Sequence, residues 1–333
     1  MIRLLKCIYL LLTFVSPVLS IGQTTPVPTY PVSLTVALDG SGNYKTIQEA
    51  VNAVRDLSQV EVKIFIKKGV YHEKLVIPSW KSNITLVGES NENTIITNSD
   101  YSGKDYPGKD LTGKVKFSTF TSYTVLVQGE AFTAENLTIE NKAGRVGQAV
   151  ALHVEADRCI IKQCRLLGNQ DTLYTANTGS RQYYKECFIE GTTDFIFGEA
   201  TAVFQDCTIR SLTNSYITAA STSARKKYGY VFFDCKLIAD TAAKKVFLGR
   251  PWRPNAKTVF INTDMGEHIV PAGWNNWSIP LNEKTAYYAE FNSRGAGANI
   301  KDRVKWSRQL SRKEVKEYTL ENIFQGTGWI RSM

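Results

Sequence analysis

The sequence predicts an all-β fold: a right-handed parallel β-helix, a solenoid, with a short capping helix at its N-terminal end and a short C-terminal helix. Two observations predict it. Short β-rich runs alternate with Gly, Asn and Asp turns from about residue 62 to residue 265, and long helical periodicity is absent there. In addition, one short pattern recurs along the same region.

The recurring pattern lies in five segments, FTAENLTI, IIKQCRLL, YYKECFIE, VFQDCTIR and VFFDCKLI. We align them on Asn136, Cys164, Cys187, Cys207 and Cys235, which are 28, 23, 20 and 28 residues apart. Constant local register with variable spacing is typical of solenoid coils whose connecting loops differ in length. Each unit is too short to bury its own apolar face, so successive coils must stack. Propeller blades have longer repeats, and the Leu/Asn signature of leucine-rich repeats is missing.

Parallel stacking places the four cysteines in one column. Cys187 and Cys207 are one short coil apart, and we predict a disulfide between them. The alternative is a ladder of buried free thiols, which pack as small hydrophobic side chains. No CxxC pair occurs and the histidines are widely spaced, so we expect no metal site.

Both ends of the solenoid have helix signals. Thr46 and Glu49 form a capping-box pattern that follows an expected strand at about 33–38. The apolar residues of the helix after it share one face: Ile47, Ala50, Val51 and Val54. Ser311 and Glu314 form a second capping-box pattern before KEVKEYTLENIF, which predicts the short C-terminal helix.

Residues 1–20 have the layout of a secretory signal peptide. Arg3 and Lys6 precede an apolar run that is too short for a good transmembrane helix, and small residues follow it. Residues 21–32 are rich in Pro and Thr and are interpreted as a linker, and 33–333 as one catalytic domain. We therefore expect a secreted protein, extracellular or periplasmic, without a membrane span.

The charge of the chain indicates the kind of partner. The formal net charge is +9, and removal of two basic residues with the signal peptide leaves about +7. A basic secreted protein suits an acidic polysaccharide or an anionic surface. A nucleic acid is the weakest of these candidates, because the chain has a secretion signal.

Polar residues cluster in four islands, which are GQAVAL (147–152), GNQDTLY (168–174), GTTDFIFG (191–198) and LGRPW (248–252). Asp171 and Asp194 are 23 residues apart, the same spacing as Cys164 and Cys187. The two carboxylates therefore share one phase on neighbouring coils, where adjacent parallel strands lie about 4.8 Å apart. Gln148 lies 23 residues before Asp171 and is expected on the preceding coil.

Two carboxylates this close titrate differently: one stays ionised and the other is pushed toward its protonated form. Arg250 would decide which, because a guanidinium favours an ionised partner. The chain has no GxSxG, HExxH or P-loop motif, so a hydrolase here would work without Ser-His machinery. The alternative is a solvated or capping pair of Asp residues with a surface Arg.

The same residues are where the sequence resembles the pectin methylesterase (pectinesterase) family. QAVAL, QDTLY, GTTDFIFG and LGRPW match family motifs in order, and DGSGNYKTIQEAV, GVYHEK, PAGWNNW and YAEFNSRGAGAN extend the match from about residue 34 to the C-terminus. The resemblance implies a β-helical esterase that hydrolyses the C6 methyl esters of homogalacturonan (pectin) to methanol and pectate. It implies no metal and no cofactor.

The resemblance also implies roles for individual residues. Asp194 would be the nucleophile that forms an acyl-enzyme, and Asp171 would protonate the departing methanol and then activate water. Gln170, helped by Gln148, would donate to the developing oxyanion. Arg250 would orient Asp194 and keep it ionised.

Substrate contacts are implied for four residues: Thr119, Tyr174, Phe195 and Trp252. Phe195 and Phe197 alternate on one strand, so one of them is expected in the core. Tyr123 stands where many relatives carry a small residue. The segment 141–148 is one residue shorter than in many plant relatives. Both departures affect the expected substrate preference and leave the expected reaction unchanged.

Two other classes of function stay open on the sequence. β-Helices also carry pectate lyases and polygalacturonases, and a third possibility is a polysaccharide-binding protein without activity. The joint presence of Gln170, Asp171, Asp194 and Arg250 favours the esterase, which we expect to act as a monomer on pectin.

Overall fold

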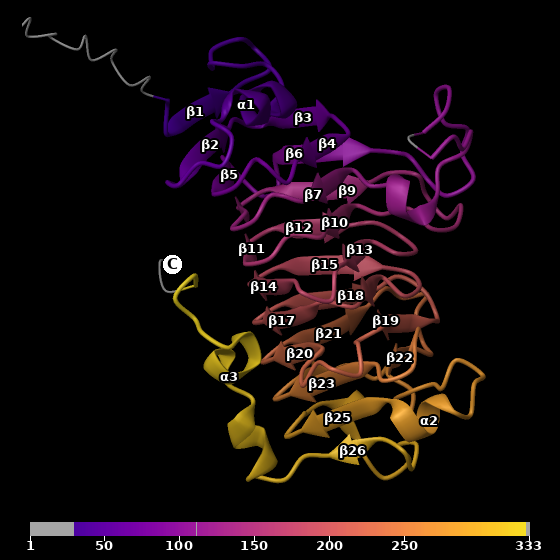
Figure 1. Cartoon of the computed structure of the whole chain (residues 1–333). Helices are drawn as coiled ribbons and strands as arrows, with labels where there is room; N and C mark the ends of the chain where they lie inside the picture. The colour runs from indigo at the N-terminus through magenta and orange to yellow at the C-terminus, as the bar shows by residue number, and fades with distance from the viewer. Residues whose placement is uncertain (1–29, 111, 331–333) are drawn as a thin grey trace, which may run out of the picture. The chain divides into compact units, whose positions relative to one another are not determined.

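Three parallel sheets run along one axis, and from β2 to β24 the chain contributes strands to the three sheets in turn (Figure 1). This computed structural model describes residues 30–110 and 112–330. The chain divides into two units, 1–30 and 31–333, and all the elements below belong to the second. The predicted signal peptide and most of the predicted linker lie outside the described residues.

The strands of the three sheets have the following bounds. Sheet 1 contains β1 (Ser33–Val36), β2 (Val62–Ile66), β5 (Ile84–Gly88), β8 (Thr133–Glu135), β11 (Cys159–Lys162), β14 (Arg181–Lys185), β17 (Thr201–Gln205), β20 (Tyr230–Phe233), β23 (Lys257–Ile261), β25 (Tyr287–Phe291) and β26 (Arg308–Gln309). Sheet 2 contains β3 (Gly69–His72), β6 (Thr94–Asn98), β9 (Thr138–Asn141), β12 (Arg165–Leu167), β15 (Phe188–Gly191), β18 (Thr208–Ser211), β21 (Lys236–Ala239) and β24 (Asp264–Met265). Sheet 3 contains β4 (Leu75–Ile77), β7 (Val125–Val127), β10 (Leu152–Val154), β13 (Leu173–Thr175), β16 (Ile196–Gly198), β19 (Tyr216–Ala220) and β22 (Phe247–Gly249). The predicted parallel β-helix is confirmed.

The core lies inside the coils, where alternate residues of each strand point. In β2, Val62, Ile64 and Ile66 are buried and the residues between them are exposed. In-register pairing stacks like side chains on successive strands. The rings of four residues in sheet 1 form such a stack, with successive centroids 4.7, 4.5 and 4.3 Å apart: Tyr184, Phe204, Phe232 and Phe260.

The corner between sheets 1 and 2 repeats in coil after coil. It has two residues, and the first has a left-handed backbone with φ of 53–55° in Asn136, Gln163, Glu186, Asp206, Asp234 and Asn262. The flanking register places Asn136 opposite Gln163 and Leu137 opposite Cys164. The predicted alignment of Asn136 with the cysteines was therefore wrong by one residue. Asn136 takes the left-handed position, and Leu137 stands in the cysteine column.

The cysteines are buried free thiols, which contradicts the predicted disulfide between Cys187 and Cys207. The spacing of adjacent parallel strands, about 4.8 Å, lies within the Cα separations that a disulfide can span, so the coil spacing allows this bond without requiring it. Each thiol instead donates to a backbone carbonyl: Cys187 Sγ lies 3.2 Å from Ile161 O and Cys207 Sγ 3.5 Å from Tyr184 O. The alternative interpretation, a ladder of free thiols, is the one observed.

Helix α1 (Ile47–Ala53) confirms the predicted N-terminal helix. Thr46 Oγ1 accepts from the Glu49 amide and Glu49 Oε2 accepts from the Thr46 amide, both at 3.2 Å, which is the capping box. The buried face of α1 packs into the main core. A second short helix, α2, covers Asn282–Thr285.

The C-terminal helix is shorter than the segment that predicted it. The Ser311–Glu314 box is present, but it opens only a 3₁₀ turn at Glu314–Glu317. Helix α3 (Leu320–Phe324) has its own N-cap, Thr319. Figure 1 shows α3 beside β14, β17 and β20, and the Phe324 ring lies 6.2 Å from the ring of Tyr183.

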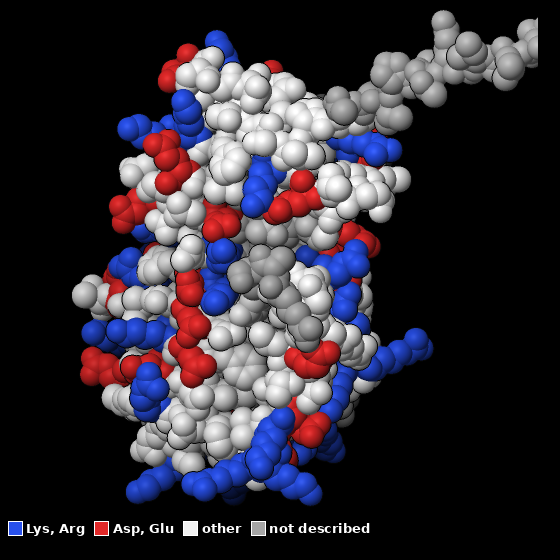
Figure 2. All heavy atoms as spheres, turned by 90° about the vertical axis from the view of Figure 1, so that its left-hand side faces the viewer, with Lys and Arg blue, Asp and Glu red and all other residues white. Residues whose placement is uncertain are grey.

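The outer face of sheet 1 carries charges of both signs. Figure 2 shows Lys and Arg beside Asp and Glu over this face. Lys162 Nζ lies 3.1 Å from Glu135 Oε1, and Lys63 Nζ lies 3.8 Å from Glu61 Oε2. Among the described residues, no helix is long and apolar enough to cross a membrane.

Candidate active site

The four polar islands meet in a cavity of about 210 Å³ beside sheet 3. Its wall is formed by Thr119, Phe120, Gln148, Gln170, Asp171, Asp194, Phe197, Ala219, Arg250, Trp252 and Trp277. All five residues predicted to be catalytic are among them. They come from the turns that lead into β10, β13 and β16 and from the residue after β22.

The two aspartates occupy equivalent positions on neighbouring coils. β13 pairs with β16 so that Leu173 lies opposite Ile196, which places Asp171 level with Asp194. Both have left-handed backbones, with φ of 66° and 48°, a conformation that Asp tolerates better than most residues. Their amides donate to carbonyls of the next coil, at 3.1 Å from Asp171 N to Thr193 O and 2.9 Å from Asp194 N to Tyr216 O. The stacked backbone therefore fixes both carboxylates.

Arg250 binds Asp194 with both arms of its guanidinium. Nε lies 3.0 Å from Oδ1 and Nη2 lies 2.6 Å from Oδ2, a bidentate ion pair. The guanidinium carbon is 4.0 Å from the ring centre of Tyr216 and 3.6 Å from that of Trp277. Because two rings and a carboxylate hold it, Arg250 has little freedom to turn away from Asp194.

The two carboxyl groups differ in proton affinity. Burial, and then the charge of Asp194, raise the pKa of Asp171 from its ordinary 3.8 to about 8, against the opposing effect of Arg250. Burial also raises the pKa of Asp194, and here the hydrogen bond and charge of Arg250 oppose it directly. Because Arg250 binds Asp194 directly, Asp171 holds a proton more strongly than Asp194 does.

The two glutamines lie side by side on adjacent coils. Gln148 forms an isolated parallel bridge with Gln170, so it lies on the coil before Asp171, as expected, and directly opposite Gln170. The Ala149 amide donates to Gln170 O at 3.1 Å and holds the two turns together. Both glutamines are half-buried in the cavity wall beside Asp171.

Comparison with known proteins identifies the family. The family model named Pectinesterase matches residues 33–327. The chain belongs to the pectinesterase family. It is 38% identical over 285 residues to Pectinesterase 31 of Arabidopsis thaliana, covering 85% of this chain and 89% of that protein. It spans about half the length of other curated Arabidopsis relatives, such as "Probable pectinesterase/pectinesterase inhibitor 23" (37% identical, 89% of this chain, 52% of that protein).

Solved structures of pectin methylesterases have the same fold. The carrot enzyme superimposes with a TM-score of 0.82 at 34% identity, covering 93% of this chain and 97% of that one. A pectin methylesterase variant in complex with a hexasaccharide superimposes with a TM-score of 0.76 at 31% identity, covering 90% and 98%.

The expected substrate contacts of this pectinesterase-family chain are only partly placed at the cavity. Thr119 and Trp252 line it. Tyr174 is buried behind the wall, where its ring stacks on Phe197 at 4.5 Å between centroids. Phe195 is fully buried in the main core, so its assignment as a substrate contact was wrong. Phe195 lies in the turn before β16, whereas Phe197 lies within β16 and lines the cavity.

Sequence reasoning missed three aromatic residues of the wall, Phe120, Phe197 and Trp277. Trp277 lies in the PAGWNNW motif, and its contact with Arg250 could have been sought there. Phe120 is adjacent to Thr119 and gave no pattern of its own. Within residues 30–110 and 112–330, no group of three or more His, Cys, Asp or Glu side chains is placed to hold a metal ion.

Proposed function

We propose that this protein is a pectin methylesterase that hydrolyses C6 methyl esters of homogalacturonan and releases methanol. One observation carries the proposal: an Asp194 carboxylate clamped by Arg250 next to an Asp171 carboxyl whose pKa is raised to about 8. One group is thereby suited to attack and the other to donate a proton. Membership of the pectinesterase family and the hexasaccharide complex of a related enzyme support pectin as the substrate.

In the first step, an Asp194 oxygen attacks the ester carbonyl carbon. The carbonyl oxygen becomes an oxyanion, to which the side-chain amides of Gln170 and Gln148 donate. As the intermediate collapses, the bond to the methoxy oxygen breaks and Asp171 gives this oxygen its proton. Methanol leaves, and the galacturonyl group is joined to Asp194 as an anhydride.

In the second step, the roles of the carboxyl groups reverse. Asp171, now ionised, accepts a proton from water as the water oxygen attacks the anhydride carbonyl. The bond to Asp194 breaks, Asp194 returns to its ionised form and Asp171 is again protonated. Arg250 holds Asp194 in one orientation throughout, and the buried setting keeps the proton on Asp171 between turnovers.

The aromatic wall supports a sugar ligand. The Trp252 ring lies edge-on to Phe197, with centroids 5.8 Å apart, and is half-exposed at the cavity. An exposed indole face beside polar donors suits the apolar faces of a pyranose ring. We propose Trp252 and Thr119 as contacts of the galacturonate units that flank the reacting ester.

The test is methanol release from highly methylated pectin, with wild type and Asp194→Asn compared at equal concentration. We expect release by wild type and almost none by the folded variant. An unsaturated uronide would instead identify a lyase, a new reducing end a polygalacturonase, and binding without any product an inactive polysaccharide-binding protein. Each of these three outcomes would overturn the proposal.

We also propose that the protein is secreted and acts as a monomer. The basic, apolar and small-residue layout of residues 1–20 supports export. N-terminal sequencing of protein recovered from the medium should begin near Ile21, and light scattering should give the mass of one chain. An uncleaved N-terminus or a dimer mass would contradict this proposal.

A further inference from the structure

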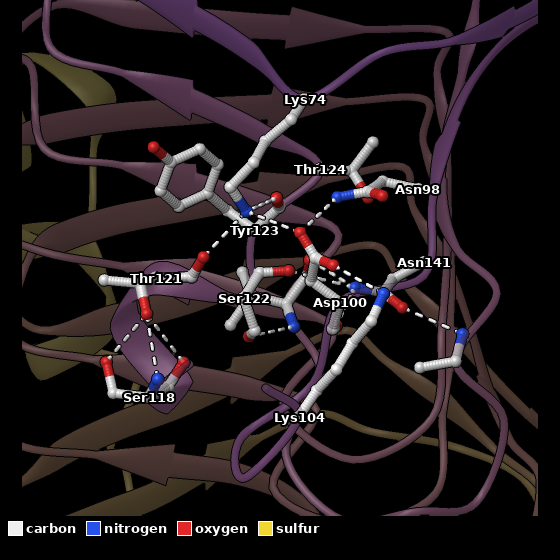
Figure 3. Close-up of polar contacts among 12 residues, drawn as sticks. Lys74, Asn98, Asp100, Lys104, Ser118, Thr121, Ser122, Tyr123, Thr124 and Asn141 are labelled. Atoms are coloured by element: carbon white, nitrogen blue, oxygen red, sulfur yellow. Dashed lines mark hydrogen bonds and ion pairs between the residues drawn. The ribbon is translucent and has the colours of Figure 1, made fainter. Parts of the chain in front are cut away.

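A half-buried lysine that the reaction does not use lies against the loop beside the cavity. Lys74 immediately precedes β4, and its side chain reaches under the segment 100–123 that joins β6 to β7 (Figure 3). Nζ donates to Asp100 Oδ2 at 3.1 Å, to Thr121 O at 2.7 Å and to Tyr123 O at 2.8 Å. An ammonium group has three donors, and these contacts satisfy all three.

The carbonyl acceptors of Lys74 lie at the end of the 3₁₀ helix η1 (Thr119–Thr121). Carbonyls at the C-terminal end of a helix have no hydrogen-bond donor within the helix, and a nearby cation can act as that donor. Lys74 Nζ also lies 4.0 Å from the ring centre of Tyr123. One ammonium thus connects the end of η1 to the strand that follows it.

The carboxylate partner of Lys74 is itself fixed. Asp100 Oδ1 accepts from Lys104 Nζ at 2.8 Å, and Oδ2 accepts from Asn98 Nδ2 at 2.9 Å (Figure 3). Burial acts to raise the pKa of Asp100, but these hydrogen bonds and the charge of Lys74 hold it below its ordinary value. Asp100 therefore stays ionised and anchors Lys74 to the first part of the loop.

Helix η1 carries two residues of the cavity wall, Thr119 and Phe120. The Phe120 side chain is exposed, and its ring lies 5.4 Å from that of Tyr174. A helix of three residues has too few internal hydrogen bonds to hold itself in one place. The position of this part of the wall must therefore come from outside η1, and Lys74 contacts its C-terminal carbonyl directly.

We propose that Lys74 is a positioning residue for the substrate cleft, which holds η1 so that Thr119 and Phe120 meet the sugar chain. The proposal rests on the proposed pectin methylesterase function. Lys74 contacts neither Asp171, Asp194 nor Arg250 in the interactions described above, so its loss should act on substrate binding more than on the chemical step.

Lys81 offers a matched control. Its side chain is more deeply buried than that of Lys74, its Nζ donates to the carbonyls of Asn52 and Val54 at the end of α1, and it pairs with Asp56 at 2.7 Å. Lys81 therefore does for α1 what Lys74 does for η1, but α1 contributes no residue to the cavity wall. Lys74→Met and Lys81→Met remove equivalent contacts at two places.

The kinetic experiment measures kcat and KM for methanol release from highly methylated pectin. We expect Lys74→Met to raise KM about tenfold and to change kcat less than about threefold. Lys81→Met should keep kcat and KM near their wild-type values. Both lysine variants should lower Tm. Phe120→Ala should also raise KM, and its combination with Lys74→Met should add little, because both changes act through one wall.

A second readout, amide hydrogen exchange at residues 118–124, does not depend on activity. Exchange there should be faster in Lys74→Met and unchanged in Lys81→Met. If Lys74→Met does not fold, Asp100→Asn should give the same changes to a smaller degree. An inactive wild type would overturn the proposed function, while exchange would still test the role of Lys74. Wild-type KM and exchange in Lys74→Met, or equal KM changes in both lysine variants, would overturn the positioning role.

Discussion

Two ladders of side chains run along this molecule, one of cysteines at the corner between sheets 1 and 2 and one of aspartates at the corner between sheets 2 and 3. Cys164 and Cys187 are 23 residues apart, and so are Asp171 and Asp194. Both pairs are aligned by the same parallel register. The stacking geometry is therefore shared, and the difference between the ladders lies in what surrounds them.

The thiols face the apolar core, where burial raises their pKa well above the ordinary value and keeps them neutral. The carboxyl groups are also buried, but Arg250 stands against only one of them. This asymmetry separates the proton affinities of Asp171 and Asp194. A repeating fold supplies equivalent positions, and one charged side chain from a later coil makes them chemically unequal.

Replacement of Asp194, the aspartate that Arg250 binds, should have the largest effect on activity. Asp194→Asn keeps the shape of the side chain but removes the nucleophile, and we expect kcat for methanol release to fall by roughly 10⁴-fold. Circular dichroism should show the wild-type fold. Cys187→Ala changes the equivalent coil in the other ladder and serves as the control, with kcat within about twofold of wild type. Activity above about a tenth of wild type in Asp194→Asn would exclude Asp194 as nucleophile.

Arg250→Lys should have the next largest effect. Lysine keeps the positive charge but cannot donate two parallel hydrogen bonds or fill the space between Tyr216 and Trp277. We expect kcat/KM to fall by about 10²-fold, corresponding to the loss of about 3 kcal/mol from a charged hydrogen-bonded pair. If Arg250→Lys is as active as wild type, the bidentate geometry has no role in the reaction.

The pH dependence of the reaction should reveal the unequal pair. Asp171 must carry a proton to release methanol, so activity should decline as pH rises through about 8, by about tenfold per unit above it. Asp194 must be ionised, so activity should also decline on the acid side, at a pH above its ordinary pKa. The measurement is kcat/KM from pH 4 to pH 10. If kcat/KM does not decline at alkaline pH, the role of Asp171 as a proton donor is contradicted.

The smallest effects should come from the cysteine ladder. Cys207→Ala opens a small cavity in the core, and we expect a free energy of unfolding lower by about 1–2 kcal/mol with activity near wild type. In the native protein, a thiol reagent should modify none of the four stacked cysteines rapidly, because they are buried and neutral. Rapid modification of Cys187 or Cys207 would mean that this corner opens in solution.

The sequence predicted the register of the cysteine-bearing coils and the aspartate pair, because both follow from the number of residues between equivalent positions. It predicted less well wherever the direction of a side chain mattered. Two residues apart, Phe195 and Phe197 would share a face of a regular strand, but β16 begins only at Ile196, so Phe195 lies in the turn and enters the core while Phe197 lines the cavity. The disulfide prediction failed for a different reason: the spacing that brings Cys187 and Cys207 onto neighbouring coils permits a disulfide but does not require one, and both thiols are free.

Residues beyond the motifs were the hardest to predict. Phe120 enters the cavity wall only because the segment 100–123 folds back over sheet 3, and nothing in its local pattern indicates that path. The contact of Lys74 with the end of η1 joins residues 47 positions apart. Such contacts depend on the path of one long loop. Neither repeat spacing nor helix and strand patterns predict that path.

The two-residue corner between sheets 1 and 2 also governs how this scaffold can change. Because the six successive coils from β8 to β24 are aligned at that corner, extra residues between sheets 2 and 3 displace no strand from its neighbours. The segment 100–123 is such an expansion, and it forms part of the cavity wall without disturbing the aspartate pair. New loops grafted at this place could therefore alter which polysaccharide the scaffold accepts while the reacting groups keep their spacing.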